Sequence, residues 1–364
     1  MSGNALTQEA VLQALRRVQE PDLGRDLVSL GFVKDVQVSG GRVALTVELP
    51  TPLFPEKREL ERECREAVAA LPGAERVEVR MTSNIPGRAR QADKMDVPGA
   101  KNLIAVASGK GGVGKSTVAV NLAVALKEAG ATVGVMDSDM YGPSMPLMLG
   151  IDGRPEGTAD NKIYPMENYG LKVMSIGFLV GDDSPVIWRG PMVMKGIQQF
   201  LGDTLWGELD YLVIDLPPGT GDAQLTVVQT VPLTGAVIVT TPQEIALLDA
   251  RKGLVMFQRV DVPILGIIEN MGYHLCPKCG HREDIFDSGG GKRAAEGYGV
   301  PFLGSIPLDT RVRLGGDRGR PVVLDAPASP MAEAFRKAAA AVAAQVSIHH
   351  FERGLATPEL KVIS

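Results

Sequence analysis

Hydrophobic residues in the first 84 positions follow two different periods. Helical spacing predicts two helices, at residues 7–18 and 56–71. Alternation with polar residues predicts three strands, at residues 32–38, 42–49 and 76–81. A Ser-Gly-Gly turn joins the first two of these strands. The sequence therefore predicts a small α/β domain over residues 1–84.

A second pattern begins at residue 101 and continues to residue 346. Continuous apolar runs predict buried strands, at residues 102–107, 132–136, 171–176, 211–214, 236–239 and 264–268. Helical stretches such as 191–204 and 245–259 separate them. This alternation predicts a mainly parallel sheet covered by helices on both faces. The Pro- and Gly-containing residues 85–100 are predicted to be a linker, and residues 347–364 a C-terminal tail.

Composition and charge narrow the possible partners. The 364 residues are 45% hydrophobic and 22% charged, with a net charge of -5 and a pI near 5.6. No Lys/Arg-rich block points to nucleic acid, and no apolar stretch reaches the 18 or so residues that a membrane-spanning helix needs. The first 20 residues lack the layout of an export signal. We expect a cytoplasmic protein that binds neither nucleic acid nor membrane.

Residues 109–117 read Gly-Lys-Gly-Gly-Val-Gly-Lys-Ser-Thr and follow a predicted strand. Gly109, Gly114, Lys115 and Ser116 satisfy the phosphate-binding loop motif, in which backbone N–H groups surround the phosphates. The lysine neutralises phosphate charge and the hydroxyl ligates Mg²⁺. The sequence therefore predicts a P-loop NTPase that binds a nucleotide and magnesium. The loop contains a second lysine, Lys110, directly after its first glycine.

Carboxylates end two of the predicted strands. Asp215 closes the apolar run Tyr-Leu-Val-Ile-Asp and can hold the water shell of magnesium opposite Ser116. Asp137 and Asp139 follow the strand at 132–136, where ligands of open α/β sheets gather. We expect Asp137 in the magnesium shell and Asp139 to orient the attacking water.

Cys276 and Cys279 frame a Cys-Pro-Lys-Cys turn after the strand at 264–268. Two thiolates at this spacing can bind one metal ion or cluster, yet iron-sulfur clusters and structural zinc commonly take four ligands. A second copy of the chain can supply two more sulfurs, or His274 and His281 can complete a zinc site. A redox disulfide is a third possibility. The remaining thiol, Cys64, lies on an apolar helical stripe and is expected to be buried and inert.

Taken together, these motifs resemble the Mrp-type iron-sulfur cluster carrier ATPases. These belong to the deviant P-loop group that also contains MinD/ParA-type positioning ATPases and nitrogenase iron proteins. The segments that carry this resemblance are Gly-Lys-Gly-Gly-Val-Gly-Lys-Ser, Met-Asp-Ser-Asp-Met-Tyr-Gly-Pro-Ser, Ile-Asp-Leu-Pro-Pro-Gly-Thr-Gly-Asp, Glu-Asn-Met and Cys-Pro-Lys-Cys. The small first domain, with Leu-Gly-Phe-Val at residues 30–33, resembles the domain that precedes the ATPase in many such carriers.

The resemblance implies a role for each matching nucleotide-site position. Lys110 would reach across a homodimer to the nucleotide of the partner. The loop Gly109, Lys110, Gly111, Gly112, Val113, Gly114, Lys115, Ser116 and Thr117 would bind ATP and Mg²⁺. Asp139 would position water, Asp215 would occupy the second magnesium shell, and Asn270 would contact the adenine edge.

For the cysteines, the resemblance implies that Cys276 and Cys279 meet their counterparts at the dimer axis and hold a 4Fe-4S cluster. The expected function is an ATP-dependent carrier that transfers this cluster to recipient apoproteins. Two alternatives stay open, a MinD/ParA-type positioning ATPase and a P-loop ATPase with a structural zinc site. One departure is Phe54, which stands where many relatives place a cysteine in the small domain.

Overall fold

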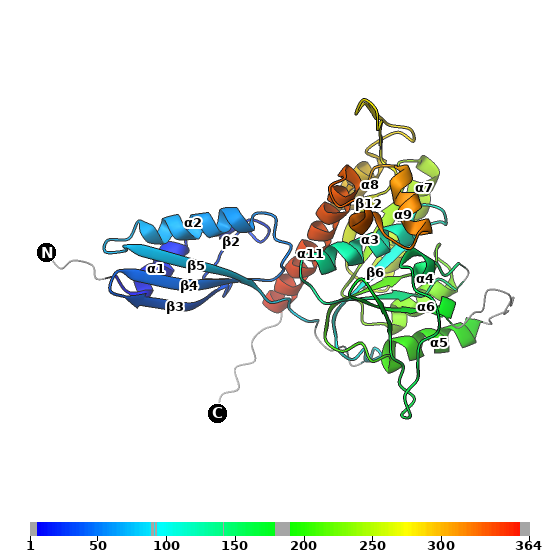
Figure 1. The fold of residues 1–364 in the computed structure, drawn as a ribbon, viewed down its shortest axis with the longest axis horizontal. Coiled ribbons are helices and arrows are strands. Elements are labelled where there is room, and N and C mark those ends of the chain that lie inside the picture. The colour runs from blue at the N-terminus through cyan, green and yellow to red at the C-terminus, as the bar shows by residue number, and fades with distance from the viewer. Residues whose placement is uncertain (1–5, 89–90, 92, 141, 179–189, 357–364) are drawn as a thin grey trace. The chain divides into compact units, whose positions relative to one another are not determined.

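The computed structural model describes residues 6–88, 91, 93–140, 142–178 and 190–356 (Figure 1). The chain divides into two compact units. The small domain comprises Met1–Pro86 and Ser347–Ser364, and the P-loop domain comprises Gly87–Val346. Each unit is described by itself below.

The small domain is a three-stranded sheet with two helices. The strands are β3 (Val33–Ser39), β4 (Arg42–Leu49) and β5 (Arg76–Ser83), and the helices are α1 (Gln8–Leu15) and α2 (Lys57–Ala69). Strand β4 pairs antiparallel with β3 and parallel with β5. A short ladder joins β1 (Gln19–Glu20) to β2 (Arg25–Asp26). The Thr7 side chain caps α1 by accepting a hydrogen bond from the N–H of Ala10 at 3.2 Å.

The C-terminal helix α11 (Pro330–Ala356) continues past the predicted boundary at residue 346. Its last part belongs to the small domain, where Phe351 packs against the apolar core. The rings of Phe351 and Phe32 meet edge to face with their centroids 5.3 Å apart. The predicted tail is therefore helical as far as Ala356, because apolar side chains beyond residue 346 have a core to pack on.

The predicted linker also differs from the structure. From Gly87 onward its described residues belong to the P-loop domain. Val97 is buried in the main apolar cluster of that domain. The N–H of Arg88 donates to the carbonyl of Lys101 at 2.9 Å, and that of Met95 to the carbonyl of Thr230 at 3.1 Å. Backbone hydrogen bonds and apolar contacts of Met95, Val97 and Ala100 thus join the described part of this segment to the P-loop domain, although its composition is typical of a linker.

The P-loop domain is built on an eight-stranded sheet in the order β15-β12-β11-β6-β10-β7-β9-β8. All neighbours are parallel except β8 and β9. The strands are β6 (Ala100–Ser108), β7 (Val133–Asp137), β8 (Met166–Asn168), β9 (Leu171–Ser175), β10 (Leu209–Asp215), β11 (Gly235–Thr240), β12 (Ile264–Glu269) and β15 (Phe302–Ser305). A separate hairpin pairs β13 (His274–Leu275) with β14 (Arg282–Glu283).

Helices cover both faces of this sheet, as the sequence predicts. Buried side chains of α5 (Gly190–Asp203), α6 (Asp222–Thr230), α7 (Glu244–Arg259) and α8 (Gly290–Tyr298) share one apolar cluster with the strands. The buried side chains of α3 (Lys115–Glu128) lie outside that cluster and fill the other face. The remaining helices are α4 (Met145–Met148), η1 (Ile176–Phe178), α9 (Thr310–Asp317) and α10 (Val322–Asp325).

Polar residues close the apolar strands at their carboxyl ends. Pairing in the sheet places Asp137 beside both Asp215 and Ser175, and Glu269 beside both Thr240 and Ser305. Since parallel strands end at one edge of the sheet, these groups gather where open α/β sheets bind their ligands. None of the described helices is long and apolar enough to cross a lipid bilayer.

Candidate functional site

The loop between β6 and α3 has a backbone that only glycine adopts easily. Gly112 and Gly114 have φ angles of 81° and 82°, in the left-handed region. A Cβ atom on Gly114 would lie 2.2 Å from Nδ2 of Asn270, so any side chain there would collide. Gly114 is also the N-cap of α3, so the loop opens onto the positive end of a helix dipole. This geometry suits phosphate.

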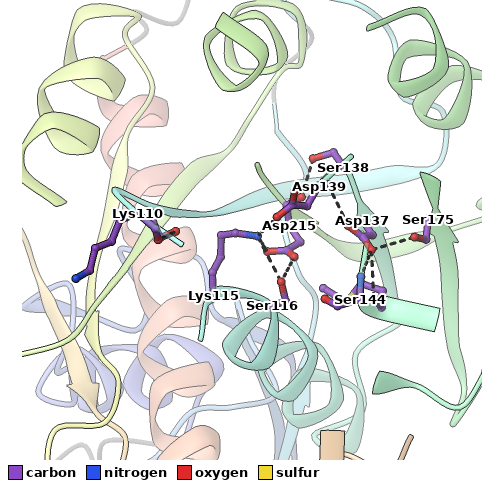
Figure 2. A network of polar contacts seen from close by, with 11 residues as sticks. Lys110, Lys115, Ser116, Asp137, Ser138, Asp139, Ser144, Ser175 and Asp215 are labelled. Atoms are coloured by element: carbon purple, nitrogen blue, oxygen red, sulfur yellow. Dashed lines mark hydrogen bonds and ion pairs between the residues drawn. The ribbon is translucent and has the colours of Figure 1, made fainter. Parts of the chain in front are cut away.

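Lys115 and Ser116 converge on Asp215 at the start of α3. Nζ of Lys115 lies 2.6 Å from Oδ1 of Asp215, and Oγ of Ser116 donates to Oδ2 of Asp215 at 2.5 Å. Asp139 Oδ2 lies 3.6 Å from the same lysine nitrogen (Figure 2). Burial raises the pKa of Asp215, and the ion pair with Lys115 opposes that rise. Four of the predicted site residues are thus brought together.

Asp137 is fully buried and is surrounded by donors. Its Oδ1 accepts from the N–H of Asp139 at 3.0 Å, and its Oδ2 accepts from the N–H groups of Ser144 and Met145 at 3.0 and 3.2 Å. The Ser175 hydroxyl donates to the same Oδ2 at 2.9 Å. Burial, and then the negative charge of Asp215, raises the pKa of Asp137 to about 7. Asp137 anchors the loop that follows it, and its predicted place in the magnesium shell stays a prediction.

Asn270 supports the phosphate loop directly. Its Nδ2 donates to the carbonyl of Val113 at 2.8 Å, and its backbone N–H donates to the carbonyl of Thr240 at 2.7 Å. The residue is buried at the carboxyl end of β12. Its contact with an adenine edge, implied by the resemblance, stays a prediction.

Lys110 is separate from this cluster. Figure 2 shows its amine pointing away from Lys115 and Asp215. The carbonyl of Lys110 accepts a hydrogen bond from the Ser108 hydroxyl at 2.9 Å, which fixes the backbone of the loop at this point. The side chain of Lys110 therefore leaves the nucleotide cradle of its own chain.

Cys276 and Cys279 lie on the β13–β14 hairpin, which follows β12. The N–H of Cys276 donates to the carbonyl of His281 at 2.9 Å, and the N–H of Gly280 donates to the carbonyl of Cys276 at 2.8 Å. Cys279 is exposed and Cys276 is half-buried. Backbone N–H groups of Cys279 and Lys278 lower the pKa of the Cys276 thiol. The hairpin therefore presents two sulfurs, and the pKa of one of them, Cys276, lies below that of an ordinary thiol.

The histidines do not complete a zinc site with these cysteines within the part of the chain that the structure describes. Nδ1 of His274 donates to the carbonyl of Leu308 at 3.0 Å. No group of three or more His, Cys, Asp or Glu side chains there is placed to hold a metal ion. Cys64 is buried in the small domain, and burial raises the pKa of its thiol to about 12, as an inert thiol requires.

Several functional contacts lie outside the sequence predictions. Ser138 donates through its N–H and its hydroxyl to the carbonyl of Asp215, at 3.0 and 2.6 Å. Ser175 and Glu269 end apolar strands, a signal that could have marked them. The buried Glu269 carboxylate accepts from the N–H of Gly291 at 2.7 Å, so the chain fills the N-terminus of α8 with its own anion.

Family models match both parts of the chain. Residues 99–343 match the family described as "NUBPL iron-transfer P-loop NTPase". The chain belongs to this family of P-loop NTPases. Residues 8–81 match a second family, described as "Iron-sulfur cluster assembly protein". The predicted family and the predicted fold are thereby confirmed.

Two curated relatives of this P-loop NTPase cover nearly the whole chain. A Synechocystis protein named "Iron-sulfur cluster carrier protein" is 50% identical, over 94% of this chain and 99% of its own length. The protein of the same name from Escherichia coli is 45% identical, over 92% of this chain and 91% of its own length.

Solved structures resemble the P-loop domain. A nucleotide-binding protein from Archaeoglobus fulgidus in complex with ADP is 40% identical, with a TM-score of 0.57, over 66% of this chain and 93% of that one. The cell division ATPase MinD from Pyrococcus furiosus is 25% identical, with a TM-score of 0.53, over 66% of this chain and 98% of that one.

Proposed function

We propose that this protein is an ATP-dependent carrier that holds a 4Fe-4S cluster between two copies of the chain and transfers it to apoproteins. The observation that carries the proposal is the hairpin with Cys276 and Cys279 on a P-loop domain of the iron-transfer family. The cluster is cargo in this proposal. The names of the two relatives, both iron-sulfur cluster carrier proteins, support it.

The P-loop supplies the nucleotide half of the function. Backbone N–H groups of residues 109–117 would surround the phosphates of ATP, and Lys115 would neutralise them. Ser116 would ligate Mg²⁺, and Asp215 would hold the second shell of that ion, since their side chains already lie 2.5 Å apart. Asp139, held near Lys115, would orient the attacking water. Magnesium would neutralise charge that develops on the phosphates.

The cysteine hairpin supplies the cargo half. One chain offers two thiols at an exposed turn, whereas a 4Fe-4S cluster takes four thiolates. Two copies facing one another complete the set. The same arrangement gives a target to Lys110, whose amine points away from the cradle of its own chain. Nucleotide turnover would then alter the interface that grips the cluster.

Anaerobic reconstitution with ferrous iron and sulfide tests the proposal. We expect one cluster per dimer, measured as iron, acid-labile sulfide and visible absorbance, and dimer mass by light scattering. Cys276→Ala/Cys279→Ala should lose the cluster and keep ATP hydrolysis within about twofold, because the thiols lie outside the P-loop network. Cys64→Ala is the matched control, since it removes the buried thiol of the small domain.

Two results would contradict the proposal. Equal iron in the wild type and the double cysteine variant would exclude these ligands. Zinc in stoichiometric amounts, retained through oxygen-free purification, would favour a structural metal site instead. The MinD-like positioning function predicts ATP-dependent sedimentation with anionic liposomes, which we expect not to occur.

A further inference from the structure

Ser175 lies beside the nucleotide site without belonging to the phosphate loop or to any motif described above. It is the last residue of β9, and pairing between β7 and β9 places it next to Asp137. The residue is fully buried. Its Oγ donates to Oδ2 of Asp137 at 2.9 Å (Figure 2). The same Oγ accepts from the N–H of Gly177 at 3.0 Å. The hydroxyl thus joins Asp137 to the turn η1.

Asp137 passes this restraint on to the loop that carries Asp139. The carboxylate accepts from the N–H of Asp139 at the start of the loop and from those of Ser144 and Met145 at its end. Both ends of the loop are therefore gathered on one side chain. Ser138 fixes the same loop from another direction, through two hydrogen bonds to the carbonyl of Asp215.

The orientation of the Asp137 carboxylate decides where these N–H groups are held. Three of its four donors belong to the backbone of the loop, so they move with it. The fourth donor, Ser175, belongs to a neighbouring strand of the sheet, which is rigid by comparison. Ser175 therefore ties the carboxylate to the scaffold. Catalytic groups held to within a fraction of an ångström depend on such supporting contacts.

We propose that Ser175 is a positioning residue for nucleotide hydrolysis, which acts through Asp137 to hold Asp139 beside Lys115. The inference rests on the nucleotide hydrolysis proposed above. Ser175 does not contact the phosphate loop in this account, so its loss should affect turnover and leave nucleotide binding intact. A serine that only fills space in β9 would have no such selective effect.

A matched pair of substitutions separates the hydroxyl from the volume of the side chain. Ser175→Thr keeps the hydroxyl donor. Ser175→Val has nearly the same shape as that threonine but replaces the hydroxyl with a methyl group. We expect Ser175→Val to lower kcat at least about tenfold with KM for ATP within about twofold. Ser175→Thr should stay within about threefold of the wild type. Equal melting temperatures of the two variants would show that folding is not the cause.

A second readout does not require hydrolysis. Hydrogen exchange at the amides of Asp139, Ser144 and Met145 should be faster in Ser175→Val than in Ser175→Thr, and exchange in β10 should match. If the wild type hydrolyses no ATP, the proposed function fails and the catalytic part of the inference fails with it, while the exchange comparison still decides whether Ser175 restrains the loop. Equal exchange in both variants, equal losses of kcat, or a change confined to KM would each overturn the inference.

Discussion

The nucleotide site and the cysteine hairpin are built in opposite ways on the same domain. Around Asp215 and Asp137, buried carboxylates each meet several donors, and Lys115 lies 2.6 Å from one of them. Around Cys276 the donors are backbone N–H groups, and the neighbouring Cys279 is exposed to solvent. Under the proposed function, the first site would keep one geometry to accelerate a reaction, whereas the second would accept and release cargo. Dense bonding suits the former and exposure suits the latter.

Removing the central cation should break the nucleotide site most severely. Lys115→Ala deletes the partner of Asp215 and the charge that would neutralise phosphate. We therefore expect the rate of ATP hydrolysis, measured as inorganic phosphate released, to fall at least about a hundredfold. Lys127→Ala, in the last turn of the same helix, is the control and should behave as the wild type. Hydrolysis within tenfold of the wild type would mean that Lys115 is not the phosphate lysine.

An exposed apolar surface on α7 is a candidate for the interface between two copies of the chain. Ile245 and Leu248 are 69% and 57% exposed, and the Asp249 backbone of this helix approaches Gly109 of the P-loop. If two copies meet here, Ile245→Asp buries a charge and should weaken ATP-dependent dimerisation at least about tenfold. Val255→Asp, about three turns along the helix, is the control. Analytical ultracentrifugation with ATP measures both, and an unchanged dimer would remove α7 from the interface.

Asn270 distinguishes support of the loop from recognition of the base. Asn270→Ala removes the donor to the Val113 carbonyl, so we expect ATP and GTP to bind about five- to tenfold more weakly. Any additional loss for ATP alone would measure the adenine contact that the resemblance implies. Titration calorimetry with both nucleotides gives the comparison. Unchanged binding of both would contradict the supporting role.

The smallest expected effect concerns the hairpin thiols. The pKa of Cys276 is lowered, so its thiolate fraction rises at a lower pH than that of an ordinary thiol, and alkylation follows the thiolate. We expect the rate at which iodoacetamide modifies Cys276 to reach half of its maximum at a lower pH than the rate for free cysteine. Buried Cys64, whose pKa is raised to about 12, should stay unmodified. Peptide mass spectrometry over a pH series measures these rates, and a Cys276 midpoint at or above that of free cysteine would contradict the donor geometry.

The sequence predicted those helices and strands whose hydrophobic residues form a long regular pattern or a long continuous run. All six strands predicted for the P-loop domain are present, with ends within two residues of the predictions, because apolar runs that fill a parallel sheet are long and continuous. The three-residue β8 carries too little pattern to be predicted. The end of α1 at Leu15, rather than Val18, reflects a turn that helical spacing does not encode.

The candidate site was predictable where a motif names the residue. The P-loop and the carboxylates Asp139 and Asp215 follow from spacing and strand ends, and the structure brings them together. The role of Asp137 as a loop anchor was not predictable, because it depends on which N–H groups the folded loop turns inward. Ser175 escaped for the same reason, since its partner comes from another strand 38 residues away.

The last turns of α11 have a consequence for how the protein is made. Phe351 packs against an apolar core whose other members lie before residue 82, with the P-loop domain encoded between them. During translation, the N-terminal strands leave the ribosome long before Phe351 does. The first domain to be synthesised therefore gains this packing contact only after the P-loop domain has been made, and a transcript cut short before codon 351 removes the contact.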